Sequence, residues 1–359
     1  MKLFKSLLVA PASLGLLAPM AATANEVTIN DFNAAEEIAV TNSRVDGLEA
    51  RLNNFEAGSF SETTTASFSV DTVLGAIDGA SSETTSLDFQ FNIGLSTSFT
   101  GEDSLDIAID NGTNTPSVMA SSAVMGFDSG KELVVDGVTY SFPVGGASMI
   151  IGDSTDLSTA FTGACTYSAF TDMTPDDCGT GSSMGAGGKG VTAAMSYAFD
   201  SGFSLAGGVT SGNSEILGDA ADAFGLNAAY SADSYGLAVA YVSDDGGTST
   251  DTTYWGLNGY YTFDLASLSV GFETSDDGTT EKSGYFFGLS FPEVGPGTAN
   301  IAAATTGLFA DSETETLTYE ASYSYALNDG MTITPGIFIK EVDGADDQTG
   351  VAVKTSFSF

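Results

Sequence analysis

From Phe60 to the C-terminus, apolar and polar residues alternate in a series of segments separated by turns rich in Gly, Ser and Asp. In the clearest segment, apolar side chains and one threonine occupy every second position from Leu87 to Phe99, and mostly polar side chains lie between them. This alternation indicates β-strands with one apolar and one polar face. Further segments of the same kind span Val191–Phe199, Tyr235–Tyr241, Trp255–Phe263 and Leu317–Tyr325.

The segments are about 9 to 11 residues long, which suits a tilted strand that crosses a membrane better than a strand of a soluble protein. Their connections alternate in length along the chain. The short turns lie at 200–202, 231–234, 263–267 and 328–330, and the longer polar loops at 211–222, 243–251, 274–283, 310–316 and 341–350. Short turns at one rim and longer loops at the other are typical of outer-membrane barrels. We therefore expect an all-β, antiparallel transmembrane β-barrel of about 16 strands (about 14 to 18) over residues 59–359.

A secreted or surface β protein without a pore, such as a sandwich or a solenoid, would show the same alternation. A sandwich buries its apolar face in a dry core, whereas a membrane barrel turns that face to lipid and keeps the other wet. The export signal, the strand length and the aromatic residues near the strand ends favour the barrel.

The first 24 residues have the form of a signal peptide. Lys2 and Lys5 precede an apolar stretch at 7–17, and Ala22-Thr23-Ala24 is an A-x-A cleavage site. The alternative is an N-terminal membrane anchor, which would normally require about 20 apolar residues. We expect residues 1–24 to be removed on export and a short segment, 25–36, to follow.

Residues 37–57 repeat with a period of seven and predict a parallel coiled-coil helix, which we expect in the periplasm. Arg44 and Arg51 fall at g positions, five residues before Glu49 and Glu56 at e positions, the spacing of interhelical ion pairs. The alternative is an amphipathic helix packed on its own domain. The predicted core positions are Ile38, Thr41, Val45, Leu48, Leu52 and Phe55.

The chain ends in the strand VAVKTSFSF. An isolated strand of this kind would expose a free edge, so we expect it to pair with both the preceding strand and the first strand, near residues 60–74. Lys354 then faces the lumen as a candidate pore-lining charge, although an ordinary solvated wall residue is an equal interpretation. The lipid-facing residues would be Val351, Val353, Thr355, Phe357 and Phe359.

Charge narrows the classes of function. The chain has 47 acidic and 9 basic residues, no histidine and a net charge of −38. This excess disfavours nucleic-acid binding, and a lumen dominated by carboxylates should prefer cations. We find no catalytic motif and no phosphate loop, and we expect no enzymatic activity, no cofactor and no metal site. Past residue 59 the basic side chains are Lys131, Lys189, Lys282, Lys340 and Lys354.

Two features concern the loops. Cys165 and Cys178 are the two cysteines of the chain, and in an exported protein we expect a disulfide rather than free thiols. They lie in the stretch 153–190, which lacks clear alternation and either folds into the barrel and narrows the pore or forms an outer loop.

The Asp pairs at 244–245, 276–277 and 346–347 lack calcium-loop spacing, which favours solvated turn residues over ligands for divalent cations.

The junction RVDGLEARLNNFEAGSFSETTTASFSVDTVLGA (44–76), the N-terminal MKLFKSLLVAPASLGLLAPMAATA and the terminal SFSF resemble the outer-membrane porins of cyanobacteria, which are related to the carbohydrate-selective porins. The resemblance implies a homotrimer in the outer membrane that passes small hydrophilic solutes such as ions, iron or sugars. It also implies that Phe357 and Phe359 form the signal for the barrel-assembly machinery. Such proteins usually carry an S-layer-homology domain before the coiled coil, whereas here only residues 25–36 lie between the cleavage site and the heptads.

Overall fold

The computed structural model describes residues 44–45, 63–81, 83–121, 124–173, 176–185, 188–212, 221–247 and 250–359. Arg44 and Val45 are helical. The predicted signal peptide (1–24), the segment 25–36 and the rest of the predicted coiled coil (37–57) lie outside the described residues. The following description concerns the unit formed by Phe60–Phe359.

Seventeen β-strands dominate the described part of this unit, and short helices occur between β5 and β6. The helices are the 3-10 helix η2 (Leu157–Thr159), α3 (Asp176–Gly179) and α4 (Gly181–Met184). Among the described residues, no helix has both the length and the apolar character needed to cross a membrane. The strands are β1 (Thr64–Asp78), β2 (Ser86–Thr97), β3 (Ser104–Gly112), β4 (Val134–Val144), β5 (Ala147–Thr155), β6 (Gly190–Ala198), β7 (Phe203–Ser211), β8 (Asp222–Ser231), β9 (Tyr235–Asp244), β10 (Thr252–Thr262), β11 (Ser267–Asp276), β12 (Glu281–Val294), β13 (Gly297–Thr305), β14 (Phe309–Ala310), β15 (Leu317–Asn328), β16 (Met331–Lys340) and β17 (Gln348–Ser358).

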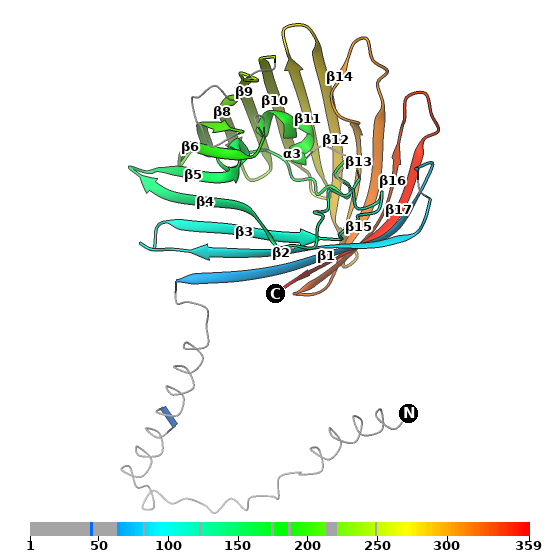
Figure 1. Cartoon of the computed structure of the whole chain (residues 1–359), viewed down its shortest axis with the longest axis horizontal. Helices are drawn as coiled ribbons and strands as arrows, with labels where there is room; N and C mark the ends of the chain where they lie inside the picture. Colours follow the sequence, from blue (N-terminus) through cyan, green and yellow to red (C-terminus); the bar gives the residue numbers. More distant parts are fainter. Residues whose placement is uncertain are drawn as a thin grey trace, which may run out of the picture. The chain divides into compact units, whose positions relative to one another are not determined.

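The strands form one closed antiparallel barrel (Figure 1). Apart from the short β14, each strand pairs with the strands before and after it in the chain, and β1 closes the sheet by pairing with both β2 and β17. The two-residue β14 pairs with β12 inside the connection from β13 to β15, so the described barrel wall has sixteen strands. The predicted all-β antiparallel barrel of about 16 strands is therefore confirmed, whereas the coiled-coil helix predicted before it stays a prediction.

The predicted alternation decides which side of each strand faces outward. Leu226, Leu257 and Phe287 are 65, 46 and 55% exposed, whereas the residues next to them along each strand are buried on the inner face. The residues of the short connections also suit the backbone conformation of tight turns. Gly145 and Gly146, between β4 and β5, both have positive φ, as a two-residue hairpin turn requires.

The last strand closes the barrel as the sequence predicts. Lys354 lies opposite Val73 of β1, and Ala352, on the same inner face, is 2% exposed. Phe359 is 74% exposed, its backbone amide donates to the carbonyl of Phe68 at 3.0 Å, and the two rings stack at 5.8 Å. Pairing on both sides leaves β17 with no free edge.

Candidate functional site

The described parts of the connection from β5 to β6, within residues 156–189, lie inside the barrel. Backbone amides of its described parts donate to side chains of β8, β10, β11 and β15. Strands so far apart around a closed barrel face one another only across its interior. This placement agrees with the first of the two interpretations of residues 153–190. Figure 1 shows α3 of this connection, which we call the lumen segment, within the ring of strands.

Neutral side chains on the inner face anchor the first part of the lumen segment. Asn227 of β8 accepts from the amide of Thr162 at 2.8 Å and donates back to its carbonyl at 3.2 Å. Asn258 of β10 accepts from the amide of Ala164 at 2.7 Å, and its own amide donates to the hydroxyl of Thr180 at 2.7 Å. These bonds satisfy polar groups that the segment would otherwise bury without partners.

Two carboxylates anchor the later part. Glu320 of β15, 4% exposed, accepts from the amides of Phe170 and Thr171 at 2.8 and 3.0 Å. It also accepts from the hydroxyls of Tyr167 and Thr171, both at 2.8 Å. Glu273 of β11, 2% exposed, accepts from the amide of Ser183. Hydrogen bonds to the charged form offset the desolvation of a buried carboxylate.

Apolar contacts and a disulfide complete this packing. Leu157 and Phe161 pack in a cluster with inner-face residues of β5 to β9. Cys165 and Cys178 are joined by a disulfide with Cα atoms 5.7 Å apart, and Cys178 packs on Phe286. We call the inner-face residues beneath the lumen segment the covered wall: Asn227, Asn258, Ser269, Glu273, Phe286 and Glu320.

The connection from β3 to β4 also turns inward. Its described parts place Met119, Val124 and Phe127 in a cluster with Val73 of β1, Phe338 of β16 and Ala352 of β17. Phe170 and Met173 of the lumen segment belong to the same cluster. The two inward connections therefore share one apolar core. Carboxylates on β3, on β4 and between them lie outside this core and border two pockets, and we call them the open wall.

This open wall consists of Asp106 and Asp110 on β3, Asp136 on β4, and Asp128 at the end of the inward β3–β4 connection. Leu105, Ile107 and Ile109 alternate with the two β3 aspartates and take the outward positions. A register shift between Ala108 and Ile109 leaves Asp136 as an extra residue on β4, and such a bulge re-aims a side chain. Two pockets of about 250 and 380 Å³ lie against this wall.

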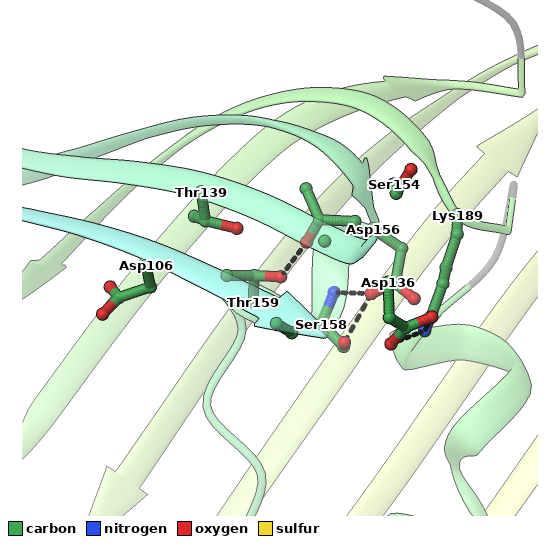
Figure 2. A pocket seen from close by; sticks show the side chains of 11 residues that line it. Asp106, Asp136, Thr139, Ser154, Asp156, Ser158, Thr159 and Lys189 are labelled. Atoms are coloured by element: carbon green, nitrogen blue, oxygen red, sulfur yellow. Dashed lines mark hydrogen bonds and ion pairs between the residues drawn. The ribbon is translucent and has the colours of Figure 1, made fainter. Parts of the chain in front are cut away.

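A single lysine faces these acids. Figure 2 shows Lys189, from the end of the lumen segment, pointing to Asp136, with Asp106 and Thr139 at the other side of the pocket. Lys189 Nζ lies 2.8 Å from Asp136 Oδ2, the one ion pair found among the described residues. The hydrogen bond to Asp136 raises the pKa of Lys189, so its charge persists at neutral pH. Burial, and then the charge of Asp136, raises the pKa of Asp128 above its usual range.

The remaining sequence-predicted residues do not line the two pockets at the open wall. Lys354 is half-buried on the inner face of β17, between Val73 of β1 and Thr334 of β16. Phe357 and Phe359 lie at the closing seam with β1. Val45 is exposed, and Ile38, Thr41, Leu48, Leu52 and Phe55 lie outside the described residues.

Sequence reasoning did not identify the open wall or the two carboxylate anchors. The segment Leu105–Asp110 carries the signal for part of the wall, because its aspartates take every fourth position on the polar face. Nothing local marks Glu320, whose partners lie about 150 residues earlier in the chain.

The Asp pairs at 244–245 and 276–277 form turn contacts. Asp244 and Asp245 accept from the amides of Gly246 and Gly247. Asp277 accepts from the amides of two threonines that follow it, which lowers the pKa of that carboxyl. In the part of the chain that the structure describes, no three His, Cys, Asp or Glu side chains gather as metal ligands would.

Solved structures share this fold at low sequence identity. Pseudomonas putida OprB in its high-pH structure is 12% identical with a TM-score of 0.64, over 83% of this chain and 94% of that one. Vibrio cholerae OmpT with loop L8 deleted is 11% identical with a TM-score of 0.60, over 83 and 99%. A double mutant of Rh. blastica porin is 14% identical with a TM-score of 0.54, over 82 and 100%.

No curated protein matches the chain significantly by sequence. The sequence does match a known family, described as Gram-negative porin, over residues 44–345. That span covers most of the chain, including the barrel from β1 to β16 and both inward connections. The closed antiparallel barrel agrees with this match, and the chain belongs to the Gram-negative porin family.

Proposed function

We propose that this outer-membrane porin passes small hydrophilic solutes along the open wall and prefers cations. The observation that carries the proposal is the grouping of Asp106, Asp110, Asp128 and Asp136 against two pockets, with Lys189 as their facing base. Family membership supports passive diffusion through an outer-membrane barrel. Inorganic ions are the first candidates, and the resemblance stated above adds iron and sugars.

The preference follows from the charges that remain unneutralised. Lys189 offsets one carboxylate, so the four aspartates of the open wall and this lysine together carry a net charge of −3 when all are ionised. Asp156 of the lumen segment, which lines the first pocket as well, adds a further negative charge. Narrow passages with low-dielectric walls focus such a field and raise the local concentration of counter-ions. The same field repels anions.

The test is the reversal potential of the mature protein in planar bilayers under a KCl gradient. We expect stepwise conductance with a cation-selective reversal potential. Asp106→Asn combined with Asp110→Asn should lower the cation-to-anion permeability ratio about 2.5- to 3-fold, since each unit charge about 10 Å away contributes roughly 0.15 kcal/mol after screening, with opposite sign for the cation and the anion. Asp233→Asn with Asp264→Asn, in exposed short turns, is the control with the same change in net charge.

Two outcomes contradict the proposal. Anion selectivity of the wild-type protein, or a control pair that shifts the potential as much as the wall pair, would remove the role of the open wall. Absence of any conductance step would favour the alternative, a surface β protein without a pore.

We also propose a homotrimer in the outer membrane of a cyanobacterium, with the 37–57 helix in the periplasm. The heptad with its core from Ile38 to Phe55, and the resemblance of the N-terminal sequences, support this part. Chemical cross-linking of the mature protein and of a variant lacking 37–57 tests it. The full chain should give a trimer band that weakens in the shortened variant; a monomer in both contradicts it.

We further propose that Phe359 serves recognition by the barrel-assembly machinery and that Lys354 does not. Phe359 joins the closing seam through its backbone and ring contacts with Phe68, whereas Lys354 lies mid-strand on the inner face. Deletion of Phe359 should lower the heat-modifiable barrel form in outer membranes several-fold, and Lys354→Ala should leave it unchanged. Equal assembly of the two variants would contradict the proposal.

A further inference from the structure

The loops that follow β13 and β16 enclose a pocket of about 630 Å³ at the rim that carries the longer loops. None of its lining residues belongs to the open wall or to the covered wall. We call this cavity the rim pocket. Its lining includes three apolar residues, Leu308, Phe309 and Val342, and the polar residues Lys340, Asp343 and Gln348.

The base of the rim pocket belongs to the inner face of the barrel. Lys340 of β16 lies opposite Gln348 of β17. Two positions further into these strands, Phe338 and Gly350 lie opposite each other, and both are buried on the inner face. Because residues two positions apart share one face of a strand, Lys340 and Gln348 also point inward. A solute in the rim pocket would therefore lie at the mouth of the lumen.

Two glutamates of the lining hold the loops in place. Glu341 accepts hydrogen bonds from the amide of Leu317 at 2.9 Å and from the hydroxyl of Tyr319 at 3.3 Å. Glu313 accepts from the amide of Ala310 at 2.9 Å, and its own amide donates to the Ala310 carbonyl at 2.8 Å. The short strand β14, which contains Ala310, also pairs with β12. The pocket is therefore formed before a ligand binds, which lowers the cost of binding.

Lys340 and Asp343, in contrast, keep their charged groups available to a ligand. Within the described residues, neither side chain forms an ion pair or a hydrogen bond with another residue. Lys340 is half-buried and Asp343 is exposed. A cation and an anion that line one pocket without pairing can both be satisfied by a ligand that carries the two opposite charges.

The other properties of the lining narrow the class of ligand. Three carboxylates and the ammonium of Lys340 give the lining a net charge of −2 when all are ionised, which disfavours simple anions. A simple cation would gain nothing from Lys340. The three apolar side chains favour a ligand with an apolar substituent, since small-molecule sites combine apolar surface with a few polar groups.

We propose that the rim pocket binds small zwitterions with an apolar substituent, the class of the apolar α-amino acids, and concentrates them at the mouth of the lumen. Lys340 binds the carboxylate of the ligand, and Asp343 binds its ammonium group. The apolar side chains of the lining contact the substituent. This site is separate from the open wall, and binding to it requires no ion flow.

The first test is the binding of L-leucine to the purified mature protein in detergent micelles, measured by saturation-transfer NMR with protein-free micelles as the blank. We expect saturable binding with a dissociation constant on the order of 1 mM. Three analogues each lack one group: isoamylamine has no carboxylate, isocaproate has no ammonium group, and glycine has no apolar substituent. Each should bind at least about threefold more weakly than leucine.

Two substitutions assign the charged groups. Lys340→Gln should weaken the binding of leucine and isocaproate about three- to fivefold without weakening that of isoamylamine. Asp343→Asn should weaken the binding of leucine and isoamylamine by about the same factor without weakening that of isocaproate. The matched controls are Lys131→Gln, between β3 and β4, and Asp329→Asn, between β15 and β16. Both residues are exposed and lie outside the pocket lining, so both controls should bind leucine as the wild type does.

Unchanged leucine affinity in Lys340→Gln would overturn the proposal. Equal affinities for leucine and isoamylamine would do so too, because the rim pocket would then be a site for cations only. The heat-modifiable band on semi-native gels shows that each variant forms the barrel. Since binding is measured at equilibrium, the result does not depend on whether the open wall conducts ions, and the failure of one proposal is distinguishable from the failure of the other.

Discussion

The covered wall and the open wall line the same barrel and both carry carboxylates, yet these groups have different surroundings. Glu273 and Glu320 are at most 4% exposed and accept hydrogen bonds from backbone amides of the lumen segment. Asp106 and Asp136 border pockets, and one lysine pairs with Asp136. The contrast shows that residue type and strand parity do not by themselves decide the role of an acid on the inner face. That role depends on whether another part of the chain packs over the carboxylate.

The largest effect on the covered wall should come from the disulfide. The double variant Cys165→Ser/Cys178→Ser should lower the free energy of unfolding by up to about 3 kcal/mol, because it releases a loop closed over 13 residues. Urea titration of the barrel in lipid vesicles measures this loss. The reversal potential should stay unchanged, since the open wall keeps its charges. If the cysteine variant shifted the selectivity as much as the Asp106 and Asp110 double variant, the covered wall and the open wall would not have separate roles.

Two acid substitutions, one on each wall, test whether the covered wall contributes more to stability than the open wall. Glu273→Ala removes the acceptor of the buried Ser183 amide and should destabilise the barrel by about 1 to 3 kcal/mol. Asp106→Ala, at an exposed position, should change the unfolding free energy by less than about 0.5 kcal/mol. Equal unfolding midpoints in urea would show that the lumen segment does not depend on its carboxylate anchor.

The smallest expected effect is a pH dependence of the cation preference, which arises from acids of the open wall. Burial and the nearby charge of Asp136 raise the pKa of Asp128. An acid with a raised pKa loses its charge at a higher pH, so cation preference should begin to fall on acidification before ordinary aspartates, with pKa about 3.9, are protonated. Lys189 stays protonated throughout, because Asp136 raises its pKa.

The measurement is the reversal potential between pH 7 and pH 4. Asp128→Asn should remove the first part of the decline. Asp277→Asn serves as control, because turn amides lower the pKa of Asp277, which lies in the turn between β11 and β12. An unchanged pH profile in Asp128→Asn would assign the titration to other acids.

Much of the barrel could be predicted from the sequence because its signals are local. Alternation over Trp255–Phe263 corresponds to β10 and its outward residues, and the turn at 200–202 corresponds to the connection between β6 and β7. The closing pair of β1 and β17 followed from the need to leave no free edge. The assumption that lumen parity means a wet face was wrong at Phe286 and Phe338, which are each 1% exposed beneath the inward connections.

The sequence by itself determined the strands, their two faces, the order of short turns and long loops, and the acid excess, since period-two patterns and composition need no long-range contact. Only the tertiary structure decided which acids are buried and which face the passage. Glu320 meets Phe170 across about 150 residues, and Asp136 meets Lys189 across 53. Such pairs depend on the path of two connections inside a closed barrel, where burial and hydrogen bonding, rather than local pattern, fix the position of each side chain.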